Sequence, residues 1–179
     1  MVLFAPTFRR ENGQLTGRQI SIHYDLDYES VCAALQKRFG GTWRMGLRLH
    51  PSVKDDTSDA ENVLNLSDYE DMQELLLAAD VLITDFSSSM WDFSLTGRPC
   101  FLFAWDFYEY LETTGVYMPV EQWPFPKAVS NEELTDNIRG FDAETYRLAL
   151  QKHHTDLGIC ETGWSAEKCS ELIFDTYSS

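Results

Sequence analysis

A serine-rich turn after an apolar segment carries the strongest chemical signal in the sequence. Residues 81–84, Val-Leu-Ile-Thr, are typical of a buried parallel strand, and Ser87–Ser89 then begin a helical stretch. Free backbone N–H groups and the helix dipole at such a turn favour an anion, and serine hydroxyls let a phosphate approach closely. The alternative is that the serines only cap the helix, because serine and aspartate are common capping residues.

Three other sets of polar residues fit the same chemistry. His50 ends a strand-like run, where it could bond a phosphate, stabilise a leaving group or carry a proton, or simply bond to loop backbone. Arg9 and Arg10 follow the first apolar run and could neutralise a pyrophosphate, or form a solvated pair. Asp92 lies one helical turn after Ser88, so its carboxylate could bind ribose hydroxyls or complement the helix dipole.

Two further segments complete the predicted nucleotide site. Asp85 opens the serine turn, and Leu66 and Ser67 end another short strand, where backbone groups could contact a base. Asp25 and Asp27 form a different pattern, the D-x-D of aspartyl-phosphate phosphatases. No clear apolar strand precedes that pattern and no matching lysine follows it, so phosphatase chemistry remains an alternative rather than our main hypothesis.

The elements that must position these residues alternate between short apolar runs and amphipathic helical runs. We expect strands over 2–5, 43–49, 62–66, 81–84 and 100–104, and helices over 28–39, 68–79, 87–97, 107–112, 131–138, 143–153 and 166–177. Ser67 or Asp68 is expected to cap the second helix, residues 20–24 to be extended, and residues 10–19, 52–61 and 113–129 to be loops. This order predicts the α/β class: a single Rossmann-like domain over residues 1–179, with a parallel sheet and a helical C-terminal tail. Ligands of such sheets bind beyond the carboxyl ends of the strands.

Composition limits the class of partner. The formal net charge of −15 excludes a generic nucleic-acid or anionic-membrane surface, because both require a basic face. No apolar run approaches the roughly 18 residues of a membrane span, and the N-terminus lacks the features of a signal peptide. The cysteines, Cys32, Cys100, Cys160 and Cys169, fit no zinc spacing. We therefore expect reduced thiols, no metal site and a cytoplasmic location.

Several segments occur together in one order. They are Leu3–Arg9, His50-Pro51, Leu66–Leu76, Ala79–Ser88 and Asp92–Pro99. In this combination the sequence resembles the C-terminal half of the CDP-glycerol glycerophosphotransferases of teichoic-acid synthesis, from residue 2 to about residue 138. The resemblance implies one half of a GT-B fold, CDP-glycerol as the donor and no cofactor. The implied reaction moves glycerol phosphate to a hydroxyl of a growing polymer and releases CMP.

The resemblance also implies roles for individual residues. His50, as the catalytic residue of this half, and the Ser87–Ser88 turn would contact the pyrophosphate, and Arg9 would lie near that cleft. The Leu66–Tyr69 loop would lie near the cytidine. The helix amides, arginines and His50 would stabilise the charged leaving group without a metal.

Two departures leave the donor open. The family usually has Arg-Gly before a tyrosine where this chain has Thr114–Tyr117, and Pro-Gly-Pro where this chain has Pro124–Pro126. A related CDP-polyol is therefore an alternative donor. A non-catalytic nucleotide-binding or regulatory module, and half of another GT-B nucleotide-sugar transferase, are the alternatives for function.

The His-Gly segment of the family's N-terminal half, to which the catalytic base is assigned, does not occur in this sequence. The resemblance therefore implies that the N-terminal half is absent, that the polymer acceptor binds through that half, and that this chain alone is inactive. We also expect self-association through the exposed domain interface. The full-length enzyme is expected to be peripheral at the cytoplasmic face of the membrane.

Overall fold

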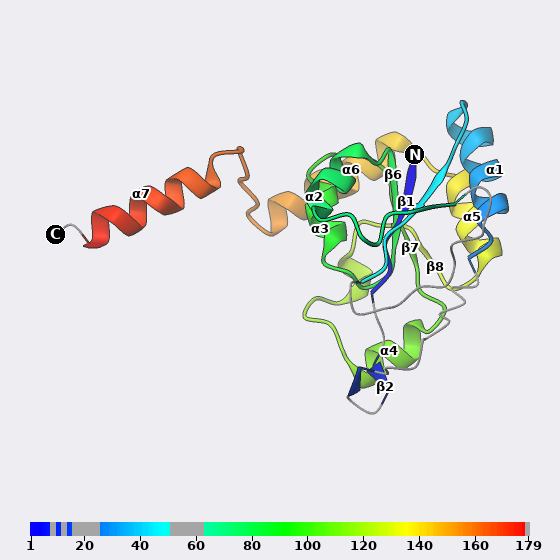
Figure 1. Ribbon diagram of the computed structural model, residues 1–179, viewed down its shortest axis with the longest axis horizontal. Helices are drawn as coiled ribbons and strands as arrows, with labels where there is room; N and C mark the ends of the chain where they lie inside the picture. Colours follow the sequence, from blue (N-terminus) through cyan, green and yellow to red (C-terminus); the bar gives the residue numbers. More distant parts are fainter. Residues whose placement is uncertain (8–9, 12–13, 16–25, 51–62, 178–179) are drawn as a thin grey trace.

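A six-stranded parallel sheet forms the centre of the molecule, with strand order β5-β4-β1-β6-β7-β8 (Figure 1). The computed structural model describes residues 1–7, 10–11, 14–15, 26–50 and 63–177. The strands are β1 (Val2–Phe4), β4 (Met45–Leu47), β5 (Val63–Asn65), β6 (Val81–Thr84), β7 (Cys100–Phe103) and β8 (Lys127–Ala128). The chain builds outward from β1 to β5 and then returns to β6 on the other side of β1. The neighbouring ends of β1 and β6 therefore form the topological switch point where doubly wound sheets bind ligands.

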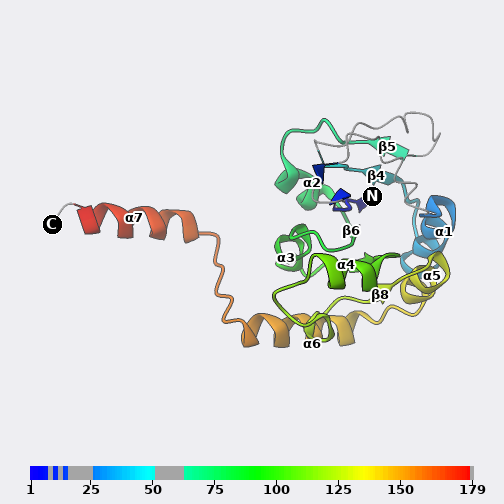
Figure 2. The same ribbon diagram turned by 90° about the horizontal axis from the view of Figure 1, so that it is seen from below.

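Helices cover both faces of the sheet. On one face lie α1 (Tyr28–Phe39) and α5 (Asn131–Arg139), and on the other lie α2 (Met72–Ala78) and α3 (Ser89–Ser94) (Figures 1 and 2). Helix α6 (Ala143–Asp156) packs against α3. Helix α4 (Phe107–Thr113) lies at the carboxyl edge of the sheet, and α7 (Ser165–Tyr177) projects away from the domain. This architecture confirms the predicted α/β fold with its helical C-terminal tail.

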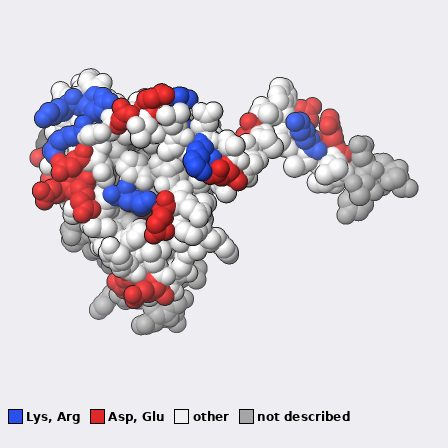
Figure 3. All heavy atoms as spheres, turned by 180° about the vertical axis from the view of Figure 1, so that it is seen from behind, with Lys and Arg blue, Asp and Glu red and all other residues white. Residues whose placement is uncertain are grey.

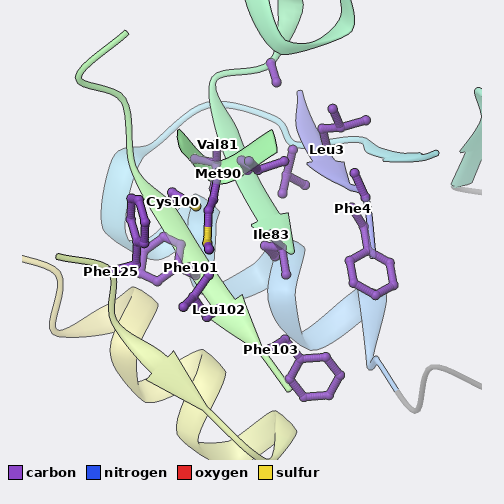
Figure 4. Packing of buried hydrophobic residues seen from close by; sticks show 14 of the residues in the cluster. Leu3, Phe4, Val81, Ile83, Met90, Cys100, Phe101, Leu102, Phe103 and Phe125 are labelled. Atoms are coloured by element: carbon purple, nitrogen blue, oxygen red, sulfur yellow. The ribbon is translucent and has the colours of Figure 1, made fainter. Parts of the chain in front are cut away.

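The core lies in the two layers between the sheet and these helices. All residues of β6 and β7 are buried, as expected for central parallel strands that are covered on both faces. Phe4, Phe93, Phe101 and Phe103 are among the largest fully buried side chains. Figure 4 shows Phe4, Phe101 and Phe103 among their neighbours from the strands. The Phe101 and Phe141 rings meet edge to face at 5.4 Å, which joins β7 to the segment before α6.

The sequence predicted several helix boundaries incorrectly. Helix α2 begins at Met72 with Asp71 as its cap, not Ser67 or Asp68. The Asp71 carboxylate accepts hydrogen bonds from the backbone amides of Gln73 at 2.7 Å and Glu74 at 3.3 Å. The preceding residues instead form a turn, in which Tyr69 N donates to Leu66 O at 3.1 Å. Helix α3 ends at Ser94, before Gly97, which has a φ of 70°.

Two segments predicted as loops contain short elements. Between residues 113 and 129 the structure has η1 (Val120–Gln122) and the edge strand β8. Strand β8 forms because Leu102 N donates to Pro126 O at 2.8 Å and Ala104 N donates to Ala128 O at 2.9 Å. The segment after β1 contains an antiparallel pair, β2 (Arg10–Glu11) and β3 (Gln14–Leu15). The predicted extended segment 20–24 and the predicted loop 52–61 lie outside the described residues.

We expect Tyr146→Phe to lower the free energy of unfolding by about 1–2 kcal/mol in urea titrations. The Tyr146 hydroxyl accepts a hydrogen bond from Cys100 N and donates one to Arg98 O, both at 3.1 Å, so it joins α6 to the start of β7. Burial raises the pKa of Tyr146, so the hydroxyl stays a neutral donor. The control is Tyr108→Phe, whose side chain is 76% exposed. Equal losses of stability in the two variants would contradict this role.

Candidate functional site

Asp85 joins the loops that follow β1 and β6 at the switch point of the sheet. Its side chain is 1% exposed, and Oδ1 accepts hydrogen bonds from Thr7 N at 2.8 Å and Phe86 N at 2.7 Å. Nearby, Thr84 Oγ1 donates to Ala5 O at 2.7 Å. The carboxylate therefore satisfies one backbone amide in each loop and fixes their relative position.

The serine turn leads from β6 into α3. Ser87 Oγ lies 2.9 Å from Ser89 Oγ and accepts a long hydrogen bond from Ser89 N at 3.4 Å. Ser88 occupies the N-cap position and is exposed, but its side chain makes no capping hydrogen bond. The capping alternative therefore does not account for the Ser88 hydroxyl. Helix α3 has only six residues, so its dipole is small. The backbone amides and hydroxyls of the turn are therefore the main groups that could bind an anion here.

Hydrogen bonds from Arg48 link the loop after β4 to the loop after β5. Its Nη1 donates to Ser67 O at 2.5 Å and to Leu49 O at 2.9 Å, and Leu49 N donates to Ser67 Oγ at 3.2 Å. The exposed His50 follows directly in this segment. Arg48 was not among the predicted site residues, although its place two residues before His50 was an available signal.

The position of Leu66, in the loop after β5, is fixed by close contact with β4. Leu66 N donates to Leu47 O at 2.7 Å, which extends the pairing of β4 and β5 by one bond. A Cβ at Gly46 would lie 2.8 Å from Leu66 Cδ1, so glycine leaves the space that the Leu66 side chain occupies. The Leu66–Ser67 segment is therefore held by both backbone pairing and packing.

The remaining predicted residues have three different outcomes. Asp92 is exposed on α3, and its Oδ2 accepts a hydrogen bond from Gln73 Nε2 of α2 at 3.2 Å, so it faces the β5–α2 side of the site. Arg9 and Asp25 lie outside the described residues. The Asp27 carboxylate caps α1 through Ser30 N at 2.9 Å and Ser30 Oγ at 2.6 Å, and these bonds lower its pKa. That capping role favours a structural function for Asp27 over the phosphatase alternative.

Two hollows lie on the side of the serine turn that faces α4 and β8. The larger, about 700 Å³, lies among Phe86, Ser88, Trp91, Tyr110, the loop 114–118 and Trp123. The smaller, about 220 Å³, lies beyond the ends of β6, β7 and β8 and includes Asp85, Lys127 and Glu133 in its lining. The Phe86 ring belongs to the lining of both hollows and stacks on Tyr110 with 3.8 Å between ring centroids.

In the part of the chain that the structure describes, no cluster of three or more histidine, cysteine, aspartate or glutamate side chains could hold a metal ion. Of the helices in that same part, none combines the length and apolar character that a membrane crossing requires. Cys32, Cys100, Cys160 and Cys169 are free thiols.

The strand order and the polar loops at the switch point define an α/β domain of the Rossmann-like class. The chain belongs to the CDP-Glycerol:Poly(glycerophosphate) glycerophosphotransferase family, whose model matches residues 1–175. This membership confirms the family predicted from the sequence motifs.

Relatives and a solved structure agree with that membership. Over 97% of its length the chain is 28% identical to a teichoic acid glycerol-phosphate transferase of Staphylococcus aureus, and it covers 45% of that protein. Over 96% it is 30% identical to a teichoic acid ribitol-phosphate primase of Bacillus spizizenii, of which it covers 43%. A variant of the wall teichoic acid polymerase TagF matches 98% of this chain with a TM-score of 0.70 and 25% identity, over 43% of that chain. A TagF variant has also been solved after a soak with CDPG. The chain thus spans less than half the length of each of these proteins.

Proposed function

We propose that residues 1–179 form the donor-binding domain of a glycerophosphotransferase that uses CDP-glycerol or a related CDP-polyol. The enzyme transfers polyol phosphate to a hydroxyl of a teichoic-acid-type polymer and releases CMP. The observation that carries this proposal is the convergence of the polar loops after β1, β4, β5 and β6 at one edge, with the first and last joined by Asp85. Membership in a glycerophosphotransferase family supports assigning this chemistry to that edge.

In this proposal the pyrophosphate lies beside the serine turn. Ser87, Ser88 and Arg9 bind its oxygens, since hydroxyls and guanidinium groups are effective phosphate donors. His50 is the catalytic residue of this domain, because its imidazole donates a hydrogen bond, and finally a proton, to the phosphate oxygen of departing CMP. Asp85 acts indirectly, by holding the loops that carry these groups.

The nucleoside occupies the β5–α2 side of the same edge. Backbone groups of Leu66 and Ser67 contact the cytosine, and the Asp92 carboxylate binds a ribose hydroxyl. Arg48 supports this arrangement, since its bond to Ser67 O couples the base-binding loop to the His50 segment. In this proposal the donor site is formed by two pairs of hydrogen-bonded loops. Asp85 joins the loops after β1 and β6, and Arg48 joins the loops after β4 and β5.

The acceptor hydroxyl must lose a proton during transfer. We infer from the family resemblance that the base that takes this proton, and most of the acceptor surface, lie outside this chain. We therefore expect the isolated chain to bind the donor without turning it over. We also propose that the complete enzyme works in the cytoplasm, as a peripheral protein at the cytoplasmic face of the membrane.

Calorimetric titration of the 179-residue chain tests the donor proposal. CDP-glycerol, CDP-ribitol, CDP, UDP and GDP are titrated separately into the same preparation. Selective binding of the cytidine ligands supports the proposal, whereas a preference for UDP or GDP supports the alternative of another nucleotide-sugar transferase. Both CDP-polyols are needed because relatives named for glycerol phosphate and for ribitol phosphate are similar to this chain at 28% and 30% identity.

We expect the isolated chain to self-associate, and Phe174→Glu to weaken that association. Helix α7 stands away from the domain (Figures 1 and 3), with Phe174 69% exposed and Ile173 56% exposed, and Trp164 just before it is 63% exposed. Burying such side chains in a second copy removes apolar area from water. Sedimentation velocity over a concentration series measures the association. Leu148→Glu on α6, at a side chain 51% exposed, is the control. A monomeric profile at every concentration would refute the expectation.

A further inference from the structure

The larger hollow lies on the opposite side of α3 from the proposed nucleoside contacts. Asp92 of α3 faces α2 through its bond to Gln73, whereas Trp91 of α3 packs against Trp123, with 5.6 Å between ring centroids. Figure 2 shows α3 lying between α2 and the side of the sheet that carries α4 and β8. Ser88 belongs to the lining of this hollow. A donor phosphate bound at the serine turn would therefore have the nucleoside on one side and the hollow on the other.

The described residues that line this hollow are rich in aromatic rings and carry no charge. Phe86, Trp91, Tyr110 and Trp123 contribute rings, and the hydroxyls of Ser88, Thr114, Tyr110 and Tyr117 supply polar groups. Of the described residues that line it, none is acidic or basic. The Trp91 ring stacks on the imidazole of His153, with 5.2 Å between ring centroids. Burial lowers the pKa of His153, which favours the neutral imidazole beside this wall of the hollow.

This combination fits a neutral carbohydrate better than a phosphate chain. Sugar rings present apolar C–H faces that pack on aromatic rings and hydroxyls that bond to polar groups at the rim, which matches the usual build of a specific pocket. A phosphodiester carries a negative charge, and the described lining offers it no cationic partner. A volume of about 700 Å³ also exceeds what a three-carbon polyol fills.

The geometry of in-line transfer also favours an acceptor group in this hollow. In phosphoryl transfer the attacking and leaving oxygens lie roughly opposite each other across the phosphorus. If CMP leaves toward the β5–α2 side, the acceptor hydroxyl approaches from the side of the hollow. An acceptor group seated there would bring its neighbouring hydroxyl toward the serine turn.

We propose that the aromatic hollow beside α3 binds an uncharged sugar ring of the acceptor. The proposal rests on the donor-binding function above, because the direction of approach follows from the position of the donor. It predicts that a neutral sugar and a cytidine nucleotide bind the chain at the same time.

Tryptophan fluorescence of the 179-residue chain tests this proposal, because Trp91 and Trp123 line the hollow. Cellobiose, chitobiose, a glycerol-phosphate dimer and CDP are titrated separately, and the disaccharides are then titrated again in saturating CDP. We expect at least one disaccharide to change the emission, with or without CDP. Tyr110→Ala should weaken this binding by about 3- to 10-fold, from loss of one aromatic contact. Val116→Arg should abolish it, because it places a charge in the hollow.

Matched controls separate these effects from damage to the fold. Tyr108→Ala removes a 76% exposed tyrosine of the same helix that does not line the larger hollow, and Leu148→Arg adds the same charge on α6. Both should bind the disaccharide like the unmodified chain, and all four variants should retain CDP binding. The proposal is overturned by the absence of disaccharide binding, by binding that Tyr110→Ala and Val116→Arg leave unchanged, or by competition with CDP. Loss of CDP binding with disaccharide binding intact would refute the donor function alone.

Discussion

Asp85→Ala is expected to lower the free energy of unfolding by about 2–4 kcal/mol and to abolish binding of the cytidine donor. The carboxylate is 1% exposed and accepts hydrogen bonds from Thr7 N and Phe86 N. Alanine would leave both amides without this acceptor in a buried region, and the penalty for unsatisfied buried amides is larger than the net value of the bonds. The loops after β1 and β6 would also lose the link that sets their relative position.

Asp85→Asn separates the charge from the geometry. The amide oxygen of asparagine can accept the same two hydrogen bonds, so we expect a loss of less than about 1.5 kcal/mol and retained donor binding. Urea unfolding and calorimetric titration are measured on both variants. Equal behaviour of the alanine and asparagine variants would show that the two accepted hydrogen bonds do not carry the role of Asp85.

His50→Ala is expected to weaken donor binding by about 10- to 100-fold, with almost no change in the free energy of unfolding. A hydrogen bond to a charged phosphate contributes about 1.5–3 kcal/mol, whereas an exposed side chain contributes little to folding. His50 is exposed at the carboxyl edge of the sheet, so it is accessible to the phosphate and its removal should cost little stability. Calorimetry with CDP-glycerol and with CDP measures the affinities.

Two further variants define what a loss at His50 means. His154→Ala removes an imidazole from α6, where Nε2 lies 2.9 Å from Ser94 Oγ, and should leave donor affinity unchanged. Ser88→Ala should weaken binding by a smaller factor than His50→Ala, because it removes one neutral hydroxyl from the phosphate site. If His50→Ala and His154→Ala bind the donor equally well, His50 has no part in the donor site. The non-catalytic binding module would then be the better hypothesis.

Sequence periodicity predicted the elements with strong local signals. Helix α1 and strand β6 have the predicted bounds, because one shows helical apolar spacing ended by Gly40 and the other is a continuous apolar run. Strand β8 was missed because two residues directly after Pro126 carry no periodicity, and its hydrogen bonds come from β7. The cap of α2 was misplaced because Ser67, Asp68 and Asp71 are all suitable residues, and only the turn at Leu66–Tyr69 selects Asp71.

For the candidate site, the sequence by itself determined the family and the residue types at the carboxyl edge of the sheet, because motif order and strand endings are local properties. Tertiary structure determined which of those residues act on one another. Asp85 was predicted as a nucleotide-binding residue, and that role stays a prediction. Folding buries its side chain where the loops after β1 and β6 meet, and Oδ1 accepts hydrogen bonds from Phe86 N and from Thr7 N, which is 78 residues away in sequence. Neither the bonds that Arg48 makes between two loops nor the aromatic hollow was predicted from the sequence. Their roles arise from contacts between distant segments, which follow from strand order rather than from spacing along the chain.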